Sequence, residues 1–369
     1  MAAKKNILLY PFSVLYGMVT GVRNFLYNTG FFESREFSIP IICVGNITVG
    51  GTGKTPHSEY LLELLGSKYR VALLSRGYRR KSSGFRIAGE GDNVNTIGDE
   101  PYQVYRKIPG LLVAVSRNRV KGVEEIIIQS PETDVIVLDD GFQHRSLKPG
   151  LTILLTDYNR LMLDDHLLPY GELRESLVNM YRADIILVTK SPATLSPMER
   201  RIIVKNFNKA AYQHIYFTTF TYKDALPVFR PVSRGGVKPE GPVTKGENIV
   251  VVTGIANPDP FIAYLSGSYH VVRHFRFGDH HEFTRKDIES IITCFNDPAN
   301  KCNRVITTEK DAVRLQEFAN IADLPVSAFW YIPVGVQFLN EDGEEFDNLV
   351  TDYVRKNIRN YRVSEGQRI

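Results

Sequence analysis

Short apolar runs recur along the chain from about residue 37 onward, and segments with a helical spacing of apolar residues separate them. Apolar runs bounded by polar turns predict buried strands, and the segments between them predict helices. The predicted strands are SIPIICVGN (38–46), YRVALLS (69–75), TDVIVLDDG (133–141), LTILLTD (151–157) and ADIILVTKS (183–191). The predicted helices are TPHSEYLLELLGSK (55–68) and VKGVEEIIIQS (120–130). This alternation indicates an α/β fold with a mostly parallel sheet flanked by helices.

A second, smaller set of strands follows a segment rich in proline, glycine and charge that begins near residue 210. Its members are IVVVTGIANP (249–258), HVVRHFRFG (270–278), NRVITTEKDA (303–312) and VSAFWYIPVGV (326–336). Because sheets of the first kind bind nucleotides at the carboxyl ends of their strands, we expect a nucleotide-binding domain at 36–215. We expect an interdomain connection at 216–246 and a smaller C-terminal α/β domain at 247–369.

The N-terminal segment 1–35 is unusually apolar and aromatic for the start of a globular chain. Its clean run, Ile7 to Val22, would span roughly 24 Å as a helix, which is less than the roughly 30 Å of a hydrocarbon core. We therefore expect a helix that lies on a membrane interface or packs, partly exposed, on the domain. A core helix is the alternative, and a signal peptide or a membrane span is less favoured.

Composition narrows the functional classes. The 369 residues carry 45 Lys and Arg against 41 Asp and Glu, so the formal net charge of +4 gives no reason to expect a nucleic acid partner. Three scattered cysteines without C-x-x-C spacing suggest neither a disulfide framework nor a zinc site, which fits a reducing compartment.

The stretch VGNITVGGTGKT (44–55) follows a predicted strand and precedes a predicted helix, which is the context of a phosphate-binding loop. The usual form, G-x-x-x-x-G-K-[ST], has a glycine where this chain has Thr48, and the pair Gly50-Gly51 replaces it. We expect Lys54 to reach the terminal phosphates and Thr55 to bind Mg²⁺. The expected nucleotide-binding residues are Thr48, Gly50, Gly51, Thr52, Gly53, Lys54 and Thr55. A GKT turn without function is the less favoured alternative.

The strand VIVLDDG ends in Asp139 and Asp140. An apolar strand that delivers carboxylates beside a phosphate loop supplies an acid to hold Mg²⁺, directly or through water. We expect both to serve the metal together with Thr55, although one would suffice. The alternative is a pair of solvated acids in a turn.

An ordered set of motifs then resembles one family. The motifs are VGNITVGGTGKTP, SRGYRRK, GDEPY, DDGFQHRSLKPGLTILLTD, LLPYGELRES, TGIANPDPF, GDHHEFT and TTEKDAVRL. They span Val44 to Leu315 and resemble those of tetraacyldisaccharide 4'-kinase, the lipid A 4'-kinase of Gram-negative bacteria. The departure is LPYGELRE where the family usually has LPAGPLRE, so Tyr170 and Glu172 replace a small residue and a proline.

The resemblance implies a P-loop-type kinase that transfers the γ-phosphate of ATP to the 4'-hydroxyl of a tetraacyldisaccharide 1-phosphate, giving lipid IVA in lipid A biosynthesis. It implies ATP and Mg²⁺ as cofactors and a peripheral location on the cytoplasmic face of the inner membrane. Since each buried CH₂ is worth about 0.8 kcal/mol, the acyl chains hold the acceptor in the bilayer, and the enzyme must come to it. We expect the lipid and the membrane surface as partners and name no protein partner.

The resemblance also assigns the proton acceptor. Asp99 in GDEP resembles the catalytic aspartate of the family, and His280 in GDHHEF would pair with it and tune its basicity. We expect Asp99 at a strand-to-helix turn, where on its own it would be interpreted as a helix cap. The neighbours Asp279 and His281 are not separated from His280 by the sequence.

The acceptor site is expected on the ligand side of the sheet. Basic SRGYRRK could meet the 1-phosphate or the sugar, although a solvated face is the default interpretation. The expected acceptor-binding residues are Arg76, Tyr78, Gln143, His144, Glu172 and Arg174. Lys310 in TTEKDAVRL either reaches phosphate or lies on a helix surface.

A second hypothesis is a membrane-associated ATPase of the deviant-loop class, K-G-G-x-G-K-[ST], acting as a switch or positioning protein. Val49 stands where that class has its signature lysine, which argues against it. VTKSP (188–192) lacks the aspartate of the guanine-reading N-K-x-D pattern, so GTP is not favoured, and ATP follows from the resemblance.

Overall fold

The computed structural model describes residues 6–229, 243–321 and 324–364, and these form two compact units. Unit 1 comprises the chain up to Asp92, Val104–Thr221 and the chain from Val336 onward. Unit 2 comprises Asn93–Gln103 and Tyr222–Gly335. The sequence placed residues 93–103 in the larger domain and the chain after residue 335 in the smaller one, so the division by contacts differs at both places.

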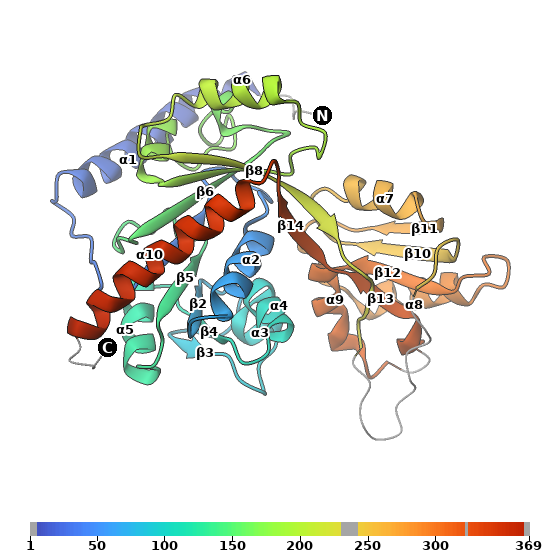
Figure 1. Ribbon diagram of the computed structural model, residues 1–369. Coiled ribbons are helices and arrows are strands. Elements are labelled where there is room, and N and C mark those ends of the chain that lie inside the picture. Colours follow the sequence, from blue (N-terminus) through green and yellow to red (C-terminus); the bar gives the residue numbers. More distant parts are fainter. Residues whose placement is uncertain (1–5, 230–242, 322–323, 365–369) are drawn as a thin grey trace. The chain divides into compact units, whose positions relative to one another are not determined.

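Unit 1 is built on a sheet of nine strands within the described residues (Figure 1). In spatial order they are β14 (Val334–Phe338), β8 (His214–Tyr222), β7 (Ile185–Thr189), β6 (Leu151–Asp157), β1 (Ile41–Gly45), β5 (Val135–Asp139), β2 (Val71–Ser75), β4 (Leu112–Val115) and β3 (Arg86–Ile87). From β8 through β4 every neighbouring pair is parallel, whereas β3 is antiparallel to β4. The mostly parallel sheet expected from the alternating pattern is confirmed.

Helices cover both faces of this sheet because successive strand residues point to opposite sides. The helices of unit 1 are α1 (Tyr10–Asn28), α2 (Lys54–Gly66), α5 (Arg119–Gln129), α6 (Pro197–Phe207) and α10 (Asp342–Ser364), with 3₁₀ helices η1 (Ile7–Leu9), η2 (Met162–Asp164) and η3 (Leu177–Arg182). Ile42 and Val44 of β1 pack in one core with α2 and α10. Ile41 and Cys43 pack on the other face with α5. The site strands are thus fixed between two apolar layers.

The C-terminal helix α10 packs on unit 1, although the sequence assigned it to the smaller domain. Phe346, Val350 and Val354 are buried against β1, β5 and α2. Their spacing of four residues predicts an amphipathic helix but does not indicate which core receives it. Only the packing supplies that information.

Unit 2 holds a second sheet, which has five strands among the described residues. In spatial order they are β11 (His270–Arg276), β10 (Asn248–Thr253), β12 (Arg304–Thr308), β13 (Phe329–Ile332) and β9 (Leu226–Pro227). Its helices are α3 (Val94–Ile97), α7 (Asp259–Ser266), α8 (Arg285–Asn296) and α9 (Glu309–Leu315), with η4 (Gln316–Phe318) and η5 (Val326–Ala328), while α4 (Asp99–Lys107) begins here and ends in unit 1. The single strand expected over 326–336 is two strands separated by Pro333, because β14 joins the sheet of unit 1.

The interdomain connection predicted over residues 216–246 also differs from the structure in its first part. β8 continues to Tyr222 as a strand of the large sheet, so residues 216–222 are regular structure. Residues 230–242, the proline- and glycine-rich part of the predicted connection, lie outside the described residues.

Helix α1 is amphipathic in the reverse of the usual sense. Its two buried residues are polar, Ser13 and Asn24, and its apolar side chains face outward. The exposed apolar residues of η1, α1 and the turn that follows are Ile7, Leu8, Tyr10, Phe12, Val14, Leu15, Met18, Val19, Val22, Phe25, Phe31 and Phe32. A core helix is therefore excluded for this segment. In the described part of the chain, no helix has the length and apolar content needed to cross a bilayer. Lys4 and Lys5, cations that flank the apolar segment in the sequence, lie outside the described residues.

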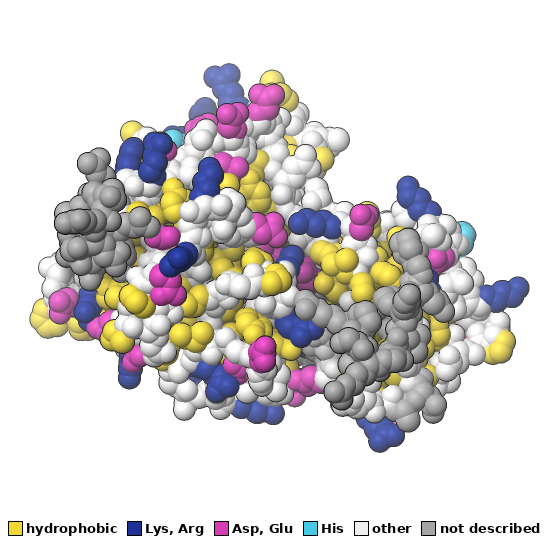
Figure 2. All heavy atoms as spheres, turned by 60° about the horizontal axis from the view of Figure 1, so that its bottom comes forward, with side chains coloured by type: hydrophobic (Ala, Val, Ile, Leu, Met, Phe, Trp, Pro, Cys, Tyr) yellow, Lys and Arg dark blue, Asp and Glu magenta, His cyan; other side chains and the backbone are white. Residues whose placement is uncertain are grey.

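Charged side chains of both signs share the surface. Figure 2 shows one face, on which Lys and Arg lie among Asp, Glu and apolar side chains rather than in one group. Exposed pairs such as Lys148–Glu36 and Arg285–Glu289 illustrate this mixing. Exposed pairs of this kind are screened by water and salt and contribute little to stability.

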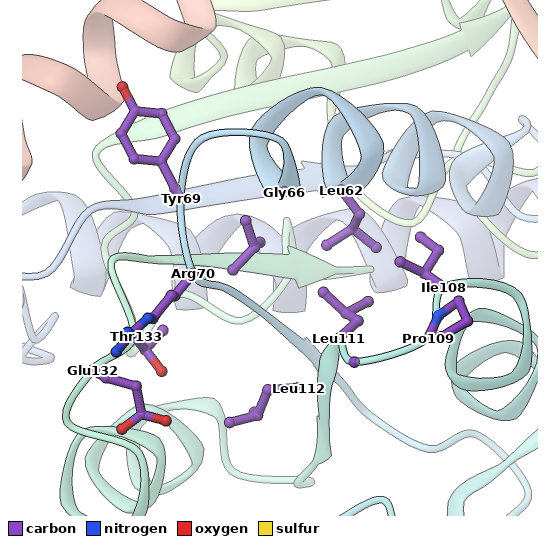
Figure 3. A pocket seen from close by; sticks show the side chains of 12 residues that line it. Leu62, Gly66, Tyr69, Arg70, Ile108, Pro109, Leu111, Leu112, Glu132 and Thr133 are labelled. Atoms are coloured by element: carbon purple, nitrogen blue, oxygen red, sulfur yellow. The ribbon is translucent and has the colours of Figure 1, made fainter.

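A hollow of about 680 Å³ lies where β2 and β4 begin (Figure 3). Leu62, Val71, Ile108 and Leu111 line it, and the side chain of Arg70 lies near Glu132 and Thr133. The phosphate loop follows the carboxyl end of β1, so this hollow is at the opposite edge of the parallel sheet. We therefore give it no part in the nucleotide site.

Candidate active site

The predicted phosphate loop connects β1 to α2, as the strand, loop and helix pattern indicates. Gly50 and Gly53 have φ angles of 100° and 87°, which favour glycine. A Cβ at Gly53 would also lie 2.7 Å from Cζ of Phe220. Gly53 is the N-cap of α2, and no side chain caps that helix end. The first N–H groups of α2 are thus left for an anion.

The carbonyl groups of the loop are turned away from that position by hydrogen bonds. Arg160 donates to the carbonyl of Val49, and the N–H of Thr52 donates to that of Gly50. The next three carbonyls, those of Gly51, Thr52 and Gly53, accept from Lys190, Thr189 and His57, respectively. Since a peptide N–H points opposite to the carbonyl before it, this pairing turns the amides of Gly50, Gly51, Gly53 and Lys54 away from the protein side, whereas the amide of Thr52 is used within the loop.

His57 was not predicted, although it lies in the quoted helix segment. Its Nδ1 is 2.7 Å from the carbonyl oxygen of Gly53, and its Nε2 is 2.9 Å from Oγ1 of Thr218 on β8. A carbonyl only accepts, so Nδ1 carries the proton and Nε2 accepts from the Thr218 hydroxyl. Burial lowers the pKa of His57 to about 4, which keeps the ring neutral. A histidine four residues after the last loop glycine is the signal that could have revealed this contact.

Lys54 extends over the loop toward two acceptors. Its Nζ is 3.2 Å from Oδ1 of Asn46 and 3.5 Å from Oδ1 of Asp140. The amide of Asn46 also donates to Oγ1 of Thr52 at 2.9 Å, which ties the start of the loop to its middle. Asn46 was not assigned a role from the sequence. Lys54 is thereby held in the position where terminal phosphates would meet it.

The two aspartates at the end of β5 differ in environment. Asp139 is buried, and one of its oxygens accepts from the Ser58 hydroxyl at 3.3 Å. Asp140 has a φ of 50° and faces Lys54 and the guanidinium of Arg174, which is 3.5 Å away. Burial alone would raise the pKa of the Asp140 carboxyl, but the charges of Lys54 and Arg174 hold that pKa below its ordinary value. Asp140 is therefore ionised at neutral pH.

One oxygen at this site fits the expected Mg²⁺. Oδ1 of Asp140 is buried and accepts no hydrogen bond in the described part of the chain, and the ammonium of Lys54 lies 3.5 Å from it. Buried carboxylate oxygens normally have a partner, so this atom suits a cation. Among the described residues, no group of three His, Cys, Asp or Glu side chains could hold a metal. A magnesium ion needs few protein ligands when phosphates and water complete its octahedron, so the two findings are compatible.

Arg119 is a further buried residue that the sequence did not indicate. It opens α5, and its Nη2 donates to the carbonyl of Asp139 at 3.1 Å while Nη1 donates to that of Ser116 at 2.7 Å. Its backbone N–H donates to Nε2 of His144 at 3.2 Å. Burial, followed by the charges of Arg119 and Arg76, lowers the pKa of His144 to about 4. Arg119 thus fixes the end of β5, where the aspartates stand.

The predicted acceptor-binding residues divide into two groups. Gln143 donates to the carbonyl of Asn46 at 2.6 Å, and Arg174 faces Asp140. The loop holding Glu172 and Arg174 runs beside the phosphate loop, because the N–H of Val49 donates to Glu172 and that of Arg174 to Ile47. The carboxylate of Glu172 pairs with Arg160.

Arg76 and Tyr78 belong to the second group and are exposed in the turn after β2, away from the direct contacts of the loop. In the same motif Arg80 is buried and donates to the carbonyl of Gly84, so it supports the turn.

A separate cluster in unit 2 contains the predicted proton acceptor. Asp99 is the first residue of α4, and the short helix α3 precedes it rather than the strand that was expected. Oδ2 of Asp99 lies 3.0 Å from Nδ1 of His280. Nη2 of Arg314 lies 2.5 Å from the same oxygen, and Nζ of Lys310 lies 3.1 Å from Nε2 of His280. The pKa of Asp99 would rise through burial, but the bond from His280 and the charges of Lys310 and Arg314 hold it well below its usual range.

The structure separates the neighbouring histidines. His280 has a φ of 56° and faces Asp99, whereas Nε2 of His281 lies 3.0 Å from Oδ2 of Asp287 at the start of α8. The ring of His281 stacks on Phe277 with centroids 4.4 Å apart. Lys310 bonds to His280 and lies 3.5 Å from Glu100, so in this structure it serves the cluster. Arg314 was not predicted.

A glycine loop between a parallel strand and a helix, with a lysine and two aspartates at adjacent strand ends, defines the class of P-loop-type nucleotide-binding proteins. Comparison with known proteins is specific. The model of the tetraacyldisaccharide-1-P 4'-kinase family matches residues 5–355, and the chain belongs to this family. It is therefore a kinase.

Relatives cover nearly the whole chain. The tetraacyldisaccharide 4'-kinase of Phocaeicola vulgatus is 44% identical over 98% of both chains, and that of Bacteroides thetaiotaomicron is 43% identical over 97% of this chain and 96% of its own. A solved structure, described as the "apo" form of LpxK from Aquifex aeolicus in complex with ATP, matches with a TM-score of 0.71. It is 29% identical to this chain and covers 94% of it, and the match takes in 98% of the solved chain.

Proposed function

We propose that this kinase moves the γ-phosphoryl group of ATP, with Mg²⁺, to the 4'-hydroxyl of a tetraacyldisaccharide 1-phosphate at the cytoplasmic surface of the inner membrane. Membership of the family and the names of the relatives support the substrate. The observation that carries the phosphate chemistry is the loop whose carbonyls are paired and whose helix end is uncapped. Such a loop is organised for an anion before the anion arrives.

The nucleotide side would be held by the loop residues 48–55. Loop amides would bind the phosphates, Lys54 would neutralise the terminal ones, and Thr55 would face the metal. Asp140 and Asp139 would hold Mg²⁺, the first by its buried Oδ1, which accepts no hydrogen bond among the described residues. When bound, Mg²⁺ neutralises charge on the β and γ phosphates.

Asp99 would receive the proton of the acceptor hydroxyl. The hydroxyl oxygen forms a bond to the γ-phosphorus, the bond to the bridging oxygen of ADP breaks, and the proton passes to the carboxylate. An ionised aspartate of low pKa is a weak base, which suits a loose transition state in which the proton leaves late. His280 and Arg314 both bind Oδ2 of Asp99 and so orient the carboxylate, while Oδ1 accepts from the N–H of Glu100 at 3.0 Å.

The acceptor would be recognised by cations and polar groups on the ligand side. Arg174 stands at Asp140, close to where the transferred group would lie, whereas exposed Arg76 and Tyr78 suit a more distant part such as the 1-phosphate. Gln143, His144 and Glu172 would contribute indirectly, because each already bonds the loop or its supports.

The exposed apolar face of α1 supports access to the lipid. Apolar side chains turned outward and polar ones turned inward are the reverse of what water favours and are suited to an interfacial helix. A variant with Phe12→Glu and Leu15→Glu should lose activity on vesicle-embedded acceptor more than on detergent-dispersed acceptor. An equal loss on both would contradict the membrane role of α1.

The test of the reaction is incubation of the full chain with ATP, Mg²⁺ and the acylated disaccharide 1-phosphate. Transfer of labelled phosphate to the lipid, absent with Lys54→Ala, is the expected result. Hydrolysis of ATP that the lipid does not affect would favour the switch ATPase instead. Lys68→Ala, at an exposed position just beyond the C-terminal end of α2, is the matched control for loss of a lysine.

A further inference from the structure

Helix α6 presents large apolar residues to solvent on its outermost side. Met198 and Ile202 are 74% and 53% exposed, respectively. The buried side of the same helix is formed by Ile203 and Phe207, which pack under β7 and β8. Residues four apart share a helix face, so Met198 and Ile202 form an outward stripe roughly opposite the buried one.

Cations flank this stripe. Arg201 and Lys205 are exposed and lie four residues apart, beside Met198 and Ile202 on the outer side of α6. Arg200, in contrast, turns inward and pairs with Asp342 at 2.7 Å. The outer face of α6 is therefore apolar and basic at once.

Exposed apolar residues also lie on η3, which contacts the C-terminal end of α6. Val178 is 71% exposed, and it lies three residues before exposed Tyr181, so the two side chains are on the same side of a 3₁₀ helix. The hydroxyl of Tyr181 donates to the carbonyl of Asn208 at the end of α6, at 3.2 Å. The hydroxyl of exposed Tyr212 donates in turn to the carbonyl of Tyr181. We call Val178, Tyr181, Met198, Ile202 and Tyr212 the α6 patch.

The α6 patch is joined to α1 through one buried carboxylate. Glu175, just before η3, pairs with Arg23 of α1 at 3.0 Å and with Arg182 of η3 at 2.7 Å. Figure 1 shows α1 and α6 along the same edge of unit 1, at the top of the view. Glu175 thus links α1 to η3, which carries part of the α6 patch.

We propose that the α6 patch is a second membrane-contact surface, which binds an anionic phospholipid bilayer beside α1. This proposal rests on the membrane association proposed above. Apolar side chains, flanking cations and tyrosines with a polar tip are the combination that an anionic lipid interface favours. A second copy of the chain fits less well, because a symmetric contact would place Arg201 and Lys205 near their own equivalents.

The test uses the full chain and sedimentation with vesicles of phosphatidylcholine, alone or with phosphatidylglycerol. Met198→Glu combined with Ile202→Glu should lower partition to the anionic vesicles roughly tenfold or more, given the apolar area lost from contact. Arg201→Gln combined with Lys205→Gln should lower it about fivefold per charge on anionic vesicles and little on neutral ones. Ile128→Glu is the matched control, since Ile128 of α5 is 73% exposed outside the patch.

Activity on detergent-dispersed acceptor and the melting temperature should stay at the wild-type values, because the substituted residues are exposed. Unchanged vesicle binding by the Met198→Glu, Ile202→Glu variant would overturn the proposal, and so would a wild-type dimer in solution that this variant dissociates. The α1 variant keeps the two ideas apart. If only the α1 variant loses vesicle binding, the membrane role of the α6 patch is contradicted and that of α1 is supported. If only the Met198→Glu, Ile202→Glu variant loses vesicle binding, the membrane role of α1 is contradicted.

Discussion

Nη2 of Arg314 lies 2.5 Å from Oδ2 of Asp99. Both residues belong to unit 2, and the same oxygen faces Nδ1 of His280. A carboxylate that accepts two donors on one oxygen is oriented firmly but is weakly basic. The two donors therefore orient the Asp99 carboxylate and lower its pKa, and the change in pKa can be measured.

Arg314→Gln should raise the pKa of Asp99 toward its ordinary value, because one of the charges that lower it is removed. The acid limb of the pH profile of kcat should move to higher pH. The free energy of unfolding that is linked to Asp99 is fully present above the unfolded pKa of 3.8 and is lost as the pH falls through the lower folded pKa. The Arg314→Gln variant should therefore be less stable than the wild type mainly above pH 3.8. Arg285→Gln, an exposed arginine of α8, is the control. An unmoved acid limb would contradict a role of Arg314 in setting the basicity of Asp99.

Asp99→Ala and His280→Ala should each lower kcat by about 10²–10⁴-fold, the usual contribution of a positioned base. Nucleotide affinity should change little, because neither side chain is proposed to hold the nucleotide. The double variant should be impaired much less than the product of the two losses, since residues that act as one unit are non-additive. Steady-state rates of the three variants decide this, and multiplicative losses would show that the two residues act independently.

Asp140→Asn and Asp139→Asn should raise the Mg²⁺ concentration needed for half-maximal activity. The shift is expected to be larger for Asp140, whose buried Oδ1 accepts no hydrogen bond among the described residues, than for Asp139, which already accepts from Ser58. Lys54→Ala should instead lower kcat by about 10²–10³-fold without a changed metal requirement. Magnesium titrations at saturating ATP measure the difference. A wild-type titration for both aspartate variants would place the metal elsewhere.

His57→Ala should raise KM for ATP, because the carbonyl of Gly53 loses the side-chain donor that holds it and the hydroxyl of Thr218 loses its acceptor. His57→Gln, which can still donate, should recover part of the loss. The folded pKa of about 4 against 6.5 unfolded means that the stability linked to His57 is full above 6.5 and falls as the pH drops toward 4. Denaturant titrations across this range should show a flatter pH dependence for the glutamine variant. Identical profiles, with an unchanged KM, would mean that His57 only fills space.

Much of unit 1 could be predicted because parallel strands buried on both faces are almost continuously apolar, and their turns carry the glycines and aspartates of the site. The contacts between side chains that are distant in the sequence could not be predicted. Nothing near Arg314 indicates that it meets Asp99, since 215 positions separate them. The pattern of α10 predicts a helix but not its partner, and Pro333 divides a run that otherwise looks like one strand. The sequence therefore predicted the elements and the loop, while the residues that orient them had to come from packing.

The hydroxyl of Tyr16 on α1 donates to the carbonyl of Arg174 at 2.9 Å, and the guanidinium of Arg174 faces Asp140. Arg174 thus contacts both the helix proposed to lie on the lipid and the carboxylate proposed to face the metal. With α1 on the bilayer as proposed, the height of the Asp140 carboxylate above the lipid is then fixed by these contacts. An enzyme mounted in this way searches for its acceptor by diffusion in two dimensions, so its rate should follow the number of acceptor molecules per unit of membrane area rather than per unit of volume.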